Sequence, residues 1–360
     1  MLIELPISKS IANRLLILQA IHGDELMPVS DSMPDDVRIM SEAIGLLGER
    51  LKARIDLGNC GTAMRFLTAY CAQLEGQTTI LDGVERMHHR PIGQLVDALR
   101  EIGADIDYLG EEGFPPLRIK GCILDKHRIV TINNPQSTQF ISALLLIGAN
   151  VQTDSTSPYI TLTRELIQRY TTLHNSTQRY TIEKDWSSAA FWYEYVAIRG
   201  GKITLPGLSR DSLQGDKVVA DIFAHLGIHT TYTAEGITLS PIAYSEASYS
   251  PLSGRPIAAQ AASRSKILVQ DFGNCPDLYP AVALTCERLG VELHATGVES
   301  LPLKESDRLR AVREHRTDAD HRMAMALLIA GYEVDDTACI SKSYPQFLEQ
   351  FHRINTLKLQ

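Results

Sequence analysis

The sequence feature that most limits the fold is a helix–glycine–strand unit that occurs three times. In residues 101–113 a helical apolar pattern ends at a glycine and is followed by alternating apolar and polar residues. Residues 225–236 repeat this order, and residues 288–293 form a weaker third copy. A glycine commonly ends a helix, and alternation is typical of a half-buried strand. The repetition predicts duplicated α/β units in both halves of the chain rather than a short-period solenoid.

Length and composition favour two globular domains and exclude several classes of partner. A chain of 360 residues can bury two cores. Its net charge of −8 argues against nucleic acid, which selects basic surfaces. The six cysteines form no CxxC pair, so we expect reduced, packed thiols rather than a zinc or redox motif. The N-terminus does not resemble a secretory signal, and no apolar run could span a bilayer, so we expect a cytoplasmic protein.

Local patterns predict several further elements. Apolar residues over 37–47 follow one helix face, with Asp35 or Asp36 at the expected N-cap. Pro91 has the position of a first-turn proline in a helix that runs to Ile102. Residues 241–266 are rich in Ser, Ala and Pro without a period, and we expect mostly loop there.

Lys9 stands at the start of a helical pattern that continues from Ile11 to Ala20. A cation is unfavourable at this end because the helix dipole already places partial positive charge there. Two interpretations remain open for this segment. Either Lys9 is solvated at small cost, or Lys9, Ser10, Arg14 and the free backbone N–H groups together bind a phosphate or carboxylate.

A second candidate anion site is the glycine-rich turn of residues 57–62, which leads into a helical segment. Two glycines before a helix allow backbone amides to approach an anion closely. No Gly-Lys-Ser/Thr follows, so the P-loop of nucleotide hydrolases is not indicated.

The C-terminal half has two more charged patterns. Lys304 and Arg308 are spaced i, i+4 as a like-charge pair on one helix face, where neighbouring acids could simply neutralise them. Asp320 precedes an apolar helical pattern and is the expected N-cap. His225 and His229 have metal-ligand spacing, but a glycine lies between them, and no HExxH motif occurs. We therefore expect no metal site.

Taken together, these segments resemble the enolpyruvylshikimate-phosphate synthases. The resemblance extends in order along nearly the whole chain, which makes chance matches of short motifs a poor explanation. The matching blocks are SKSIANR, DDVRIM, LGNCGTAMR, ERMHHRPIGQLVDALREIGA, PPLRIKG, QSTQFISALL, DWSSAAFWY, LQGDKVVAD, PDLYPAVAL, LKESDRL, DHRMAMA and SKSYP.

The resemblance implies an α/β (α+β) fold, the inside-out α/β barrel of the enolpyruvyl transferases. Two similar lobes are expected, each built from repeated βαβαββ units. Residues 8–182 would form one lobe, and residues 1–7 with 183–360 would form the other. Helix N-termini of both lobes would then supply anion-binding groups.

The implied reaction transfers the enolpyruvyl group of phosphoenolpyruvate to the 5-hydroxyl of shikimate 3-phosphate and releases phosphate. The family uses no metal and no organic cofactor, so catalysis must rest on positioning, charge stabilisation and proton transfer. The expected partners are these two small molecules, with no nucleic acid and no membrane, and the expected state is a monomer.

The resemblance also assigns site residues. For shikimate 3-phosphate they are Lys9, Ser10, Arg14, Ser137, Thr138, Gln139, Thr156, Tyr159, Asp277, Ser300 and Lys304. For phosphoenolpyruvate they are Lys9, Asn59, Gly61, Arg90, Gln139, Arg308, Arg322 and Lys342. The catalytic set is Asp277 as the base at the hydroxyl, Glu305 as the proton donor, and Lys9, which serves both substrates.

The chain departs from the family mainly by being shorter in places. Only Leu309 to Ala319 separates two motifs between which the family has a helix and strands, and the segment from Met40 to Leu57 is also short. We expect an exposed sheet edge or an incomplete core in the lobe in which the chain starts. An alternative function is therefore an impaired paralogue that binds shikimate 3-phosphate without turnover. A third is an enolpyruvyl transferase for another acceptor.

Overall fold

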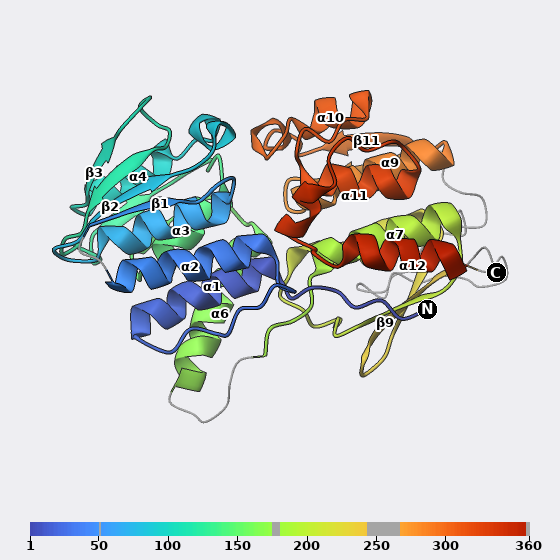
Figure 1. The fold of residues 1–360 in the computed structure, drawn as a ribbon, viewed down its shortest axis with the longest axis horizontal. Helices are drawn as coiled ribbons and strands as arrows, with labels where there is room; N and C mark the ends of the chain where they lie inside the picture. The colour runs from blue at the N-terminus through green and yellow to red at the C-terminus, as the bar shows by residue number, and fades with distance from the viewer. Residues whose placement is uncertain (50–51, 175–180, 243–266, 358–360) are drawn as a thin grey trace. The chain divides into compact units, whose positions relative to one another are not determined.

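The computed structural model describes residues 1–49, 52–174, 181–242 and 267–357. The chain divides into two compact units (Figure 1). The inserted unit comprises Lys9–Asp31 and Asp35–Ile182. The terminal unit comprises Met1–Ser8, Ser32–Pro34 and Glu183–Gln360. The expected loop at 241–266 lies almost wholly outside the described residues.

The inserted unit contains one uninterrupted βαβαββ unit. Its elements are β1 (Lys52–Asp56), α3 (Gly61–Ala72), β2 (Thr78–Asp82), α4 (Gly93–Glu101), β3 (Asp105–Tyr108) and β4 (Leu117–Lys120). The sheet order is β1-β2-β4-β3, with β1 parallel to β2 and the remaining pairs antiparallel. The parallel pair requires a crossover helix, and α3 provides it.

The rest of the inserted unit is mostly helical. It comprises α1 (Lys9–His22), α2 (Asp35–Glu49), β5 (Ile129–Thr131), α5 (Thr138–Leu146), β6 (Asn150–Gln152) and α6 (Pro158–His174), and the 3₁₀ turn η1 (Glu85–His89) precedes α4. Helix α1 is buried at eight consecutive residues from Ile11 to Leu18, as expected for a helix enclosed on all sides. Strands β5 and β6 pair in parallel, and no further strand joins them among the described residues.

The terminal unit assembles a second βαβαββ unit from the N-terminal segment and from residues 186–241. Its continuous part comprises α7 (Trp186–Arg199), β7 (Ile203–Pro206), η2 (Gly215–Val218), α8 (Val219–His225), β8 (Ile228–Tyr232) and β9 (Gly236–Pro241). These strands have the order β7-β9-β8. Leu2 forms a parallel bridge with Thr204, and the Ile3 amide donates to the Thr204 carbonyl at 3.0 Å. The N-terminal segment therefore takes the position that β1 has in the other unit.

The remainder of the terminal unit contains a two-stranded parallel sheet, β10 (Ile267–Asp271) with β11 (Glu292–Thr296), and further helices. The helices are η4 (Pro276–Leu278), α9 (Tyr279–Leu289), η5 (Leu301–Leu303), α10 (Arg308–Glu314), α11 (His321–Ala330), η6 (Ala338–Lys342) and α12 (Phe347–Leu357). Ile267 and Val269 of β10 are 47% and 70% exposed. One face of this sheet is therefore exposed at both apolar residues, whereas the exposed sheet edge expected from the shortening stays a prediction.

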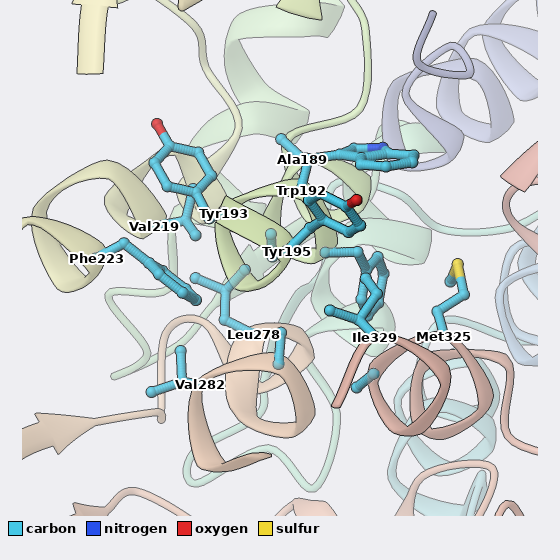
Figure 2. Close-up of a cluster of buried hydrophobic side chains, with 14 of the residues drawn as sticks. Ala189, Trp192, Tyr193, Tyr195, Val219, Phe223, Leu278, Val282, Met325 and Ile329 are labelled. Atoms are coloured by element: carbon cyan, nitrogen blue, oxygen red, sulfur yellow. The ribbon is translucent and has the colours of Figure 1, made fainter. Parts of the chain in front are cut away.

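The core of this unit is nevertheless continuous around α7. All residues from Trp186 to Val196 are buried. Figure 2 shows Trp192 and Tyr193 among side chains of the neighbouring helices, including Phe223, Leu278 and Ile329. The C-terminal helix also packs here, since the Trp192 and Phe347 rings lie 5.7 Å apart. Burying these aromatic rings contributes much of the stability of the unit.

Most local predictions are confirmed. All three helix–glycine–strand units are present, and Gly103, Gly227 and Gly290 adopt positive φ after α4, α8 and α9. Two predictions are wrong in detail. Pro91 lies before α4, which begins only at Gly93 because Ile92 is still extended in φ. Asp35 and Asp36 lie within the first turn of α2 and not before it.

Candidate active site

The start of α1 places Lys9 beside an acid that the sequence had suggested only as a helix cap. Lys9 Nζ lies 2.9 Å from Asp36 Oδ2 in the first turn of α2. The exposed fractions of these side chains are only 13% and 4%. The solvated alternative for Lys9 is therefore wrong, because the ammonium is largely enclosed and paired.

Arg14, one turn further along α1, is also buried. Its guanidinium donates to Thr163 Oγ1 at 2.7 Å, to Ser142 Oγ at 3.0 Å and to the Ser10 carbonyl at 2.8 Å. Burial lowers the pKa of Arg14 to about 10, against a small opposing influence of Tyr159. No carboxylate of the described residues pairs with Arg14, so its charge stays available to a bound anion.

The glycine-rich turn carries Arg90 directly against the start of α3. Arg90 Nη1 donates to the Asn59 carbonyl at 3.2 Å and lies 3.4 Å from Asn59 Oδ1. A Cβ atom at Gly61 would overlap the Arg90 guanidinium. The absence of a side chain at Gly61 therefore allows the Arg90 guanidinium to lie directly against the first residue of α3.

Arg65 joins the two segments of this arrangement, and the sequence interpretation did not identify it. Its guanidinium donates to the Gly61 carbonyl at 3.2 Å and to the Pro91 carbonyl at 2.9 Å. Burial, and then the charge of Arg90, hold the pKa of Arg65 well below its ordinary value. Its position four residues after Gly61, on the same helix face, was the available signal.

The starts of α5 and α6 bring more polar groups. Ser137 caps α5 by accepting from the Gln139 amide at 3.3 Å, and Gln139 Nε2 donates to Thr62 Oγ1 at 2.9 Å. The second contact ties α5 to α3. Thr138 is the first residue of α5, and Tyr159 is the second of α6. Thr156 is exposed just before α6.

In the terminal unit, three cations surround Asp277 at the start of α9. Asp277 Oδ1 lies 2.8 Å from Arg308 Nη1 and 3.9 Å from Lys304 Nζ, and Oδ2 lies 2.8 Å from Arg322 Nη2. Burial alone would raise the pKa of Asp277, but the charges of Arg322, Lys304 and Arg308 hold it well below its usual range. Asp277 is therefore ionised at neutral pH.

The expected helix face shared by Lys304 and Arg308 does not exist. Helix α10 begins only at Arg308, and Lys304 is extended after η5. Asp307 accepts from the Arg310 amide and starts the helix at this point. The like charges are instead brought together by their common partner Asp277. Ser300 precedes η5 and is half-buried.

Asp320 has a larger role than the predicted helix cap. It does cap α11, accepting from the Arg322 amide at 2.9 Å. It also pairs with Arg308, whose Nε lies 2.8 Å from Asp320 Oδ2. Burial raises the pKa of Asp320, yet the charge of Arg308 leaves it below its ordinary value. Arg308 is therefore held between two carboxylates.

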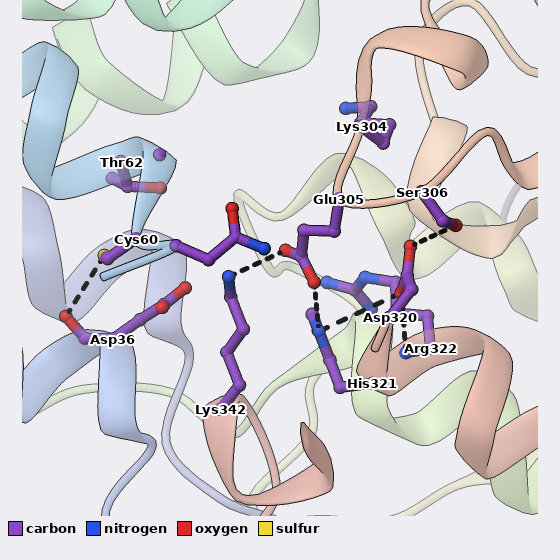
Figure 3. Close-up of polar contacts among 12 residues, drawn as sticks. Asp36, Cys60, Thr62, Lys304, Glu305, Ser306, Asp320, His321, Arg322 and Lys342 are labelled. Atoms are coloured by element: carbon purple, nitrogen blue, oxygen red, sulfur yellow. Dashed lines mark hydrogen bonds and ion pairs between the residues drawn. The ribbon is translucent and has the colours of Figure 1, made fainter. Parts of the chain in front are cut away.

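Glu305 lies between a cation and a histidine (Figure 3). Its Oε1 is 3.2 Å from Lys342 Nζ, and its Oε2 is 2.7 Å from His321 Nδ1. His321 is fully buried and was not among the expected site residues, although it adjoins Arg322 in the sequence. Possible ligand atoms of Glu305, Asp320 and His321 lie within 4.8 Å of one another. A divalent cation there would compete with Lys342 and Arg308 for the same carboxylates.

A further acid lies behind Asp277. Asp216 is buried and accepts a hydrogen bond from Ser187 Oγ. Burial, and then the negative charge of Asp277, raise the pKa of Asp216 to about 6. A second carboxyl of this kind can store a proton near neutral pH while Asp277 stays ionised.

The two units thus differ in how their buried arginines are neutralised, although Lys9 of the inserted unit does pair with Asp36. In the terminal unit Arg308, Arg322 and Lys342 all have carboxylate partners. In the inserted unit, among the described residues, no salt bridge to a carboxylate is formed by Arg14 or Arg65. Both arginines lie in the first two turns of their helices, α1 and α3, so an anion bound at these helix starts would be near uncompensated positive charge.

The fold places the chain among known structures. It is similar to EPSP synthase from Acinetobacter baumannii, with a TM-score of 0.61 and 19% sequence identity over 98% of this chain and 95% of that chain. This similarity confirms the predicted fold class, the α/β architecture of the enolpyruvyl transferases.

The sequence model of the EPSP synthase family (3-phosphoshikimate 1-carboxyvinyltransferase) matches residues 44–315 and 312–351, and the chain belongs to this family. A 3-phosphoshikimate 1-carboxyvinyltransferase of Bacteroides fragilis is 34% identical over 98% of this chain and 94% of its own length. One of Burkholderia vietnamiensis is 30% identical over 97% and 95%. The two matched segments meet within the short connection from Leu309 to Ala319.

Proposed function

We propose that the protein transfers the enolpyruvyl group of phosphoenolpyruvate to the 5-hydroxyl of shikimate 3-phosphate and releases phosphate. Membership of the EPSP synthase family supports this reaction. The single structural observation that carries it is a pair of buried arginines, Arg14 and Arg65, near the starts of α1 and α3, for which the described residues provide no carboxylate partner. Two anionic substrates would supply the missing negative charge.

In this proposal the inserted unit holds most of shikimate 3-phosphate. The binding groups are Lys9, Ser10, Arg14, Ser137, Thr138, Gln139, Thr156 and Tyr159, at the starts of α1, α5 and α6. Asp277, Ser300 and Lys304 of the terminal unit complete the set. We propose the two units as the two lobes of the enzyme, with residues 8–182 and residues 1–7 plus 183–360 as their limits.

Phosphoenolpyruvate would be bound mainly by guanidinium and ammonium groups. The residues are Lys9, Asn59, Gly61, Arg90, Gln139, Arg308, Arg322 and Lys342. Charge-assisted hydrogen bonds of this kind are about twice as strong as neutral ones. Two buried donors of this set, Arg90 Nε and Arg322 Nη1, have no hydrogen-bond partner among the described residues, and a bound anion would satisfy them.

The chemistry needs one base and one acid. As the base, Asp277 removes the proton of the 5-hydroxyl, whose oxygen attacks C2 of phosphoenolpyruvate. Glu305 protonates C3, which gives a tetrahedral intermediate with a methyl group. Loss of phosphate and of one methyl proton restores the double bond in the product. Lys9 would stabilise charge on both substrates.

The ion pairs of Asp277 suggest how substrate binding could turn this carboxylate into a stronger base. A carboxylate held by Arg308 and Arg322 is a weak base, because both guanidinium groups stabilise its charged form. The carboxylate and phosphate of phosphoenolpyruvate would compete for these guanidinium groups. Binding of this substrate would therefore raise the pKa of Asp277 toward the range in which a general base is effective.

Phosphate release from shikimate 3-phosphate and phosphoenolpyruvate tests the proposal. We expect turnover by the purified protein, and a loss of about 10²- to 10⁴-fold in kcat for Asp277→Asn or Glu305→Gln. Thermal stabilisation by shikimate 3-phosphate without phosphate release would contradict the proposal and favour a binding paralogue. Turnover only with another hydroxyl acceptor would favour a different enolpyruvyl transferase.

We further propose a monomer that works in the cytoplasm. None of the helices in the described part of the chain combines the length and apolar composition that a bilayer crossing needs. Sedimentation of the active protein would decide the oligomeric state.

A further inference from the structure

The inserted unit contains an acid where the proposed chemistry needs cations. Asp36 lies against Lys9, with 2.9 Å between the carboxylate and the ammonium, and both side chains are mostly buried. Lys9 is the first residue of α1, where the helix dipole repels a cation. We infer that Asp36 is a positioning residue that fixes the Lys9 ammonium for catalysis; this inference rests on the proposed function.

Asp36 is well placed for this task because its own position is fixed. It lies in the first turn of α2, where the helix dipole stabilises a carboxylate. Its main-chain carbonyl accepts a contact from Cys60 Sγ at 3.8 Å, which Figure 3 shows at the start of α3. Cys60 directly precedes Gly61. One residue thus connects the starts of α1, α2 and α3, which all belong to the proposed site.

The negative charge of Asp36 allows two explanations to be distinguished: that Asp36 positions Lys9, or that it acts on the substrates only through its charge. Both proposed substrates are anions, and a carboxylate near their site opposes their binding. If Asp36 acted only through its charge, Asp36→Asn would lower KM for both substrates. If Asp36 positions Lys9, the same change lets the ammonium leave its place. The loss then appears in kcat, since misplacing a catalytic group by about 1 Å can cost about a hundredfold.

Asp35 provides a matched control. It lies next to Asp36 in the same helical turn and is paired with Arg38 instead of Lys9. Asp35→Asn removes the same charge from the same end of α2 and leaves the Asp36 carboxylate that contacts Lys9 in place. Any effect of the helix dipole or of net charge should therefore be similar in the two variants.

The kinetic experiment compares Asp36→Asn, Asp35→Asn, Lys9→Met and the double variant Lys9→Met/Asp36→Asn. We expect Asp36→Asn to lower kcat by about ten- to a hundredfold, and Asp35→Asn to stay within about twofold of the wild type. In the Lys9→Met background, Asp36→Asn should have no further effect, because its role acts through Lys9. Equal effects of the two asparagine variants, or additive losses in the double variant, would overturn the inference.

A second measurement does not depend on activity. Lys9 can be labelled with a trace of acetic anhydride and quantified by peptide mass spectrometry. An ammonium held by a carboxylate must break that contact before it reacts, so Asp36→Asn should increase Lys9 acetylation severalfold and Asp35→Asn should not. If the wild type released no phosphate, the proposed function would fail, and this labelling alone would decide whether Asp36 holds Lys9. Unchanged labelling would overturn the inference in either case.

Discussion

At the scale of single residues, Gly61 matters through the side chain that it lacks. Arg90 occupies the space that a Cβ atom would need. We predict that Gly61→Ala displaces the guanidinium and raises KM for phosphoenolpyruvate by about tenfold, the value of one ordinary charge-assisted contact. Gly45→Ala is the control, since nothing lies within 4 Å of a Cβ there and its φ is unstrained. Steady-state kinetics would check this, and an unchanged KM would contradict it.

Glu194 is a buried acid that the proposed reaction does not use. It lies in the fully buried stretch of α7, and neither carboxylate oxygen has a hydrogen-bond partner among the described residues. Burial raises the pKa of Glu194 well above its ordinary value, more than Arg199 lowers it. The folded state therefore keeps the proton to a higher pH than the unfolded state, whose glutamate pKa is about 4.3.

This difference gives a prediction for pH dependence. Stability from the protonated Glu194 is fully present below about pH 4.3 and is lost as pH rises toward the folded pKa, by at most about 1.4 kcal/mol per pH unit. Glu194→Gln should therefore change little near pH 4 and stabilise the protein increasingly toward pH 8. Both tryptophans, Trp186 and Trp192, lie in α7, so their fluorescence in urea titrations reports on this unit. An equal effect of the variant at both pH values would refute the assignment.

The sequence predicted the residues of the proposed site but not the contacts that hold them. Lys9, Gly61 and Arg90 could be proposed from motifs, because residue type and local spacing define these motifs. Asp36 was predicted only as a helix cap, and His321 adjoins the predicted Arg322, yet neither was recognised as a partner of a site residue. Their contacts join residues that are distant in sequence, and such pairs are set by tertiary packing rather than by local spacing.

At the scale of elements, Asp320 and Asp307 are helix caps with different surroundings. Asp307 accepts from the Arg310 amide at an exposed position, whereas Asp320 also binds the buried Arg308. We predict a loss of about 0.5–2 kcal/mol for Asp307→Ala and about 3–5 kcal/mol for Asp320→Ala. The loss of stability is larger for Asp320→Ala because the buried Arg308 would lose one of its two carboxylate partners. Tryptophan fluorescence in urea measures the free energy of unfolding of both variants. Similar losses would contradict the prediction and show that Arg308 finds other partners when Asp320 is removed.

Element boundaries show where sequence patterns fail. The helix expected to include Lys304 and Arg308 was inferred from their spacing, but the Asp307 cap starts α10 between them. Pro91 similarly precedes its helix by two residues. The helix–glycine–strand units were predictable because glycine geometry, helix end and strand alternation agree there.

At the scale of the whole molecule, the N-terminal segment Met1–Ser8 stabilises the terminal unit, most of which is formed by Glu183–Gln360. Ile3 is fully buried, while Leu2 beside it is 52% exposed. We predict that Ile3→Ala costs about 2–5 kcal/mol and Leu2→Ala less than about 1 kcal/mol. Hydrogen exchange should show the lost protection in β7 and α7, and not in β1 or α3. Loss of protection in the inserted unit instead would contradict the assignment of this segment.

The divided terminal unit has a consequence for synthesis on the ribosome. Ile3 emerges first, but its partner Thr204 follows about 200 residues later, which corresponds to about 10–40 s of elongation. The inserted unit has all its strands and helices before that moment and can fold first. The terminal unit must then fold together with an N-terminal segment that has remained unpaired until its partner strand is synthesised. A released fragment that ends at residue 182 should therefore contain one folded unit and a protease-sensitive N-terminal tail.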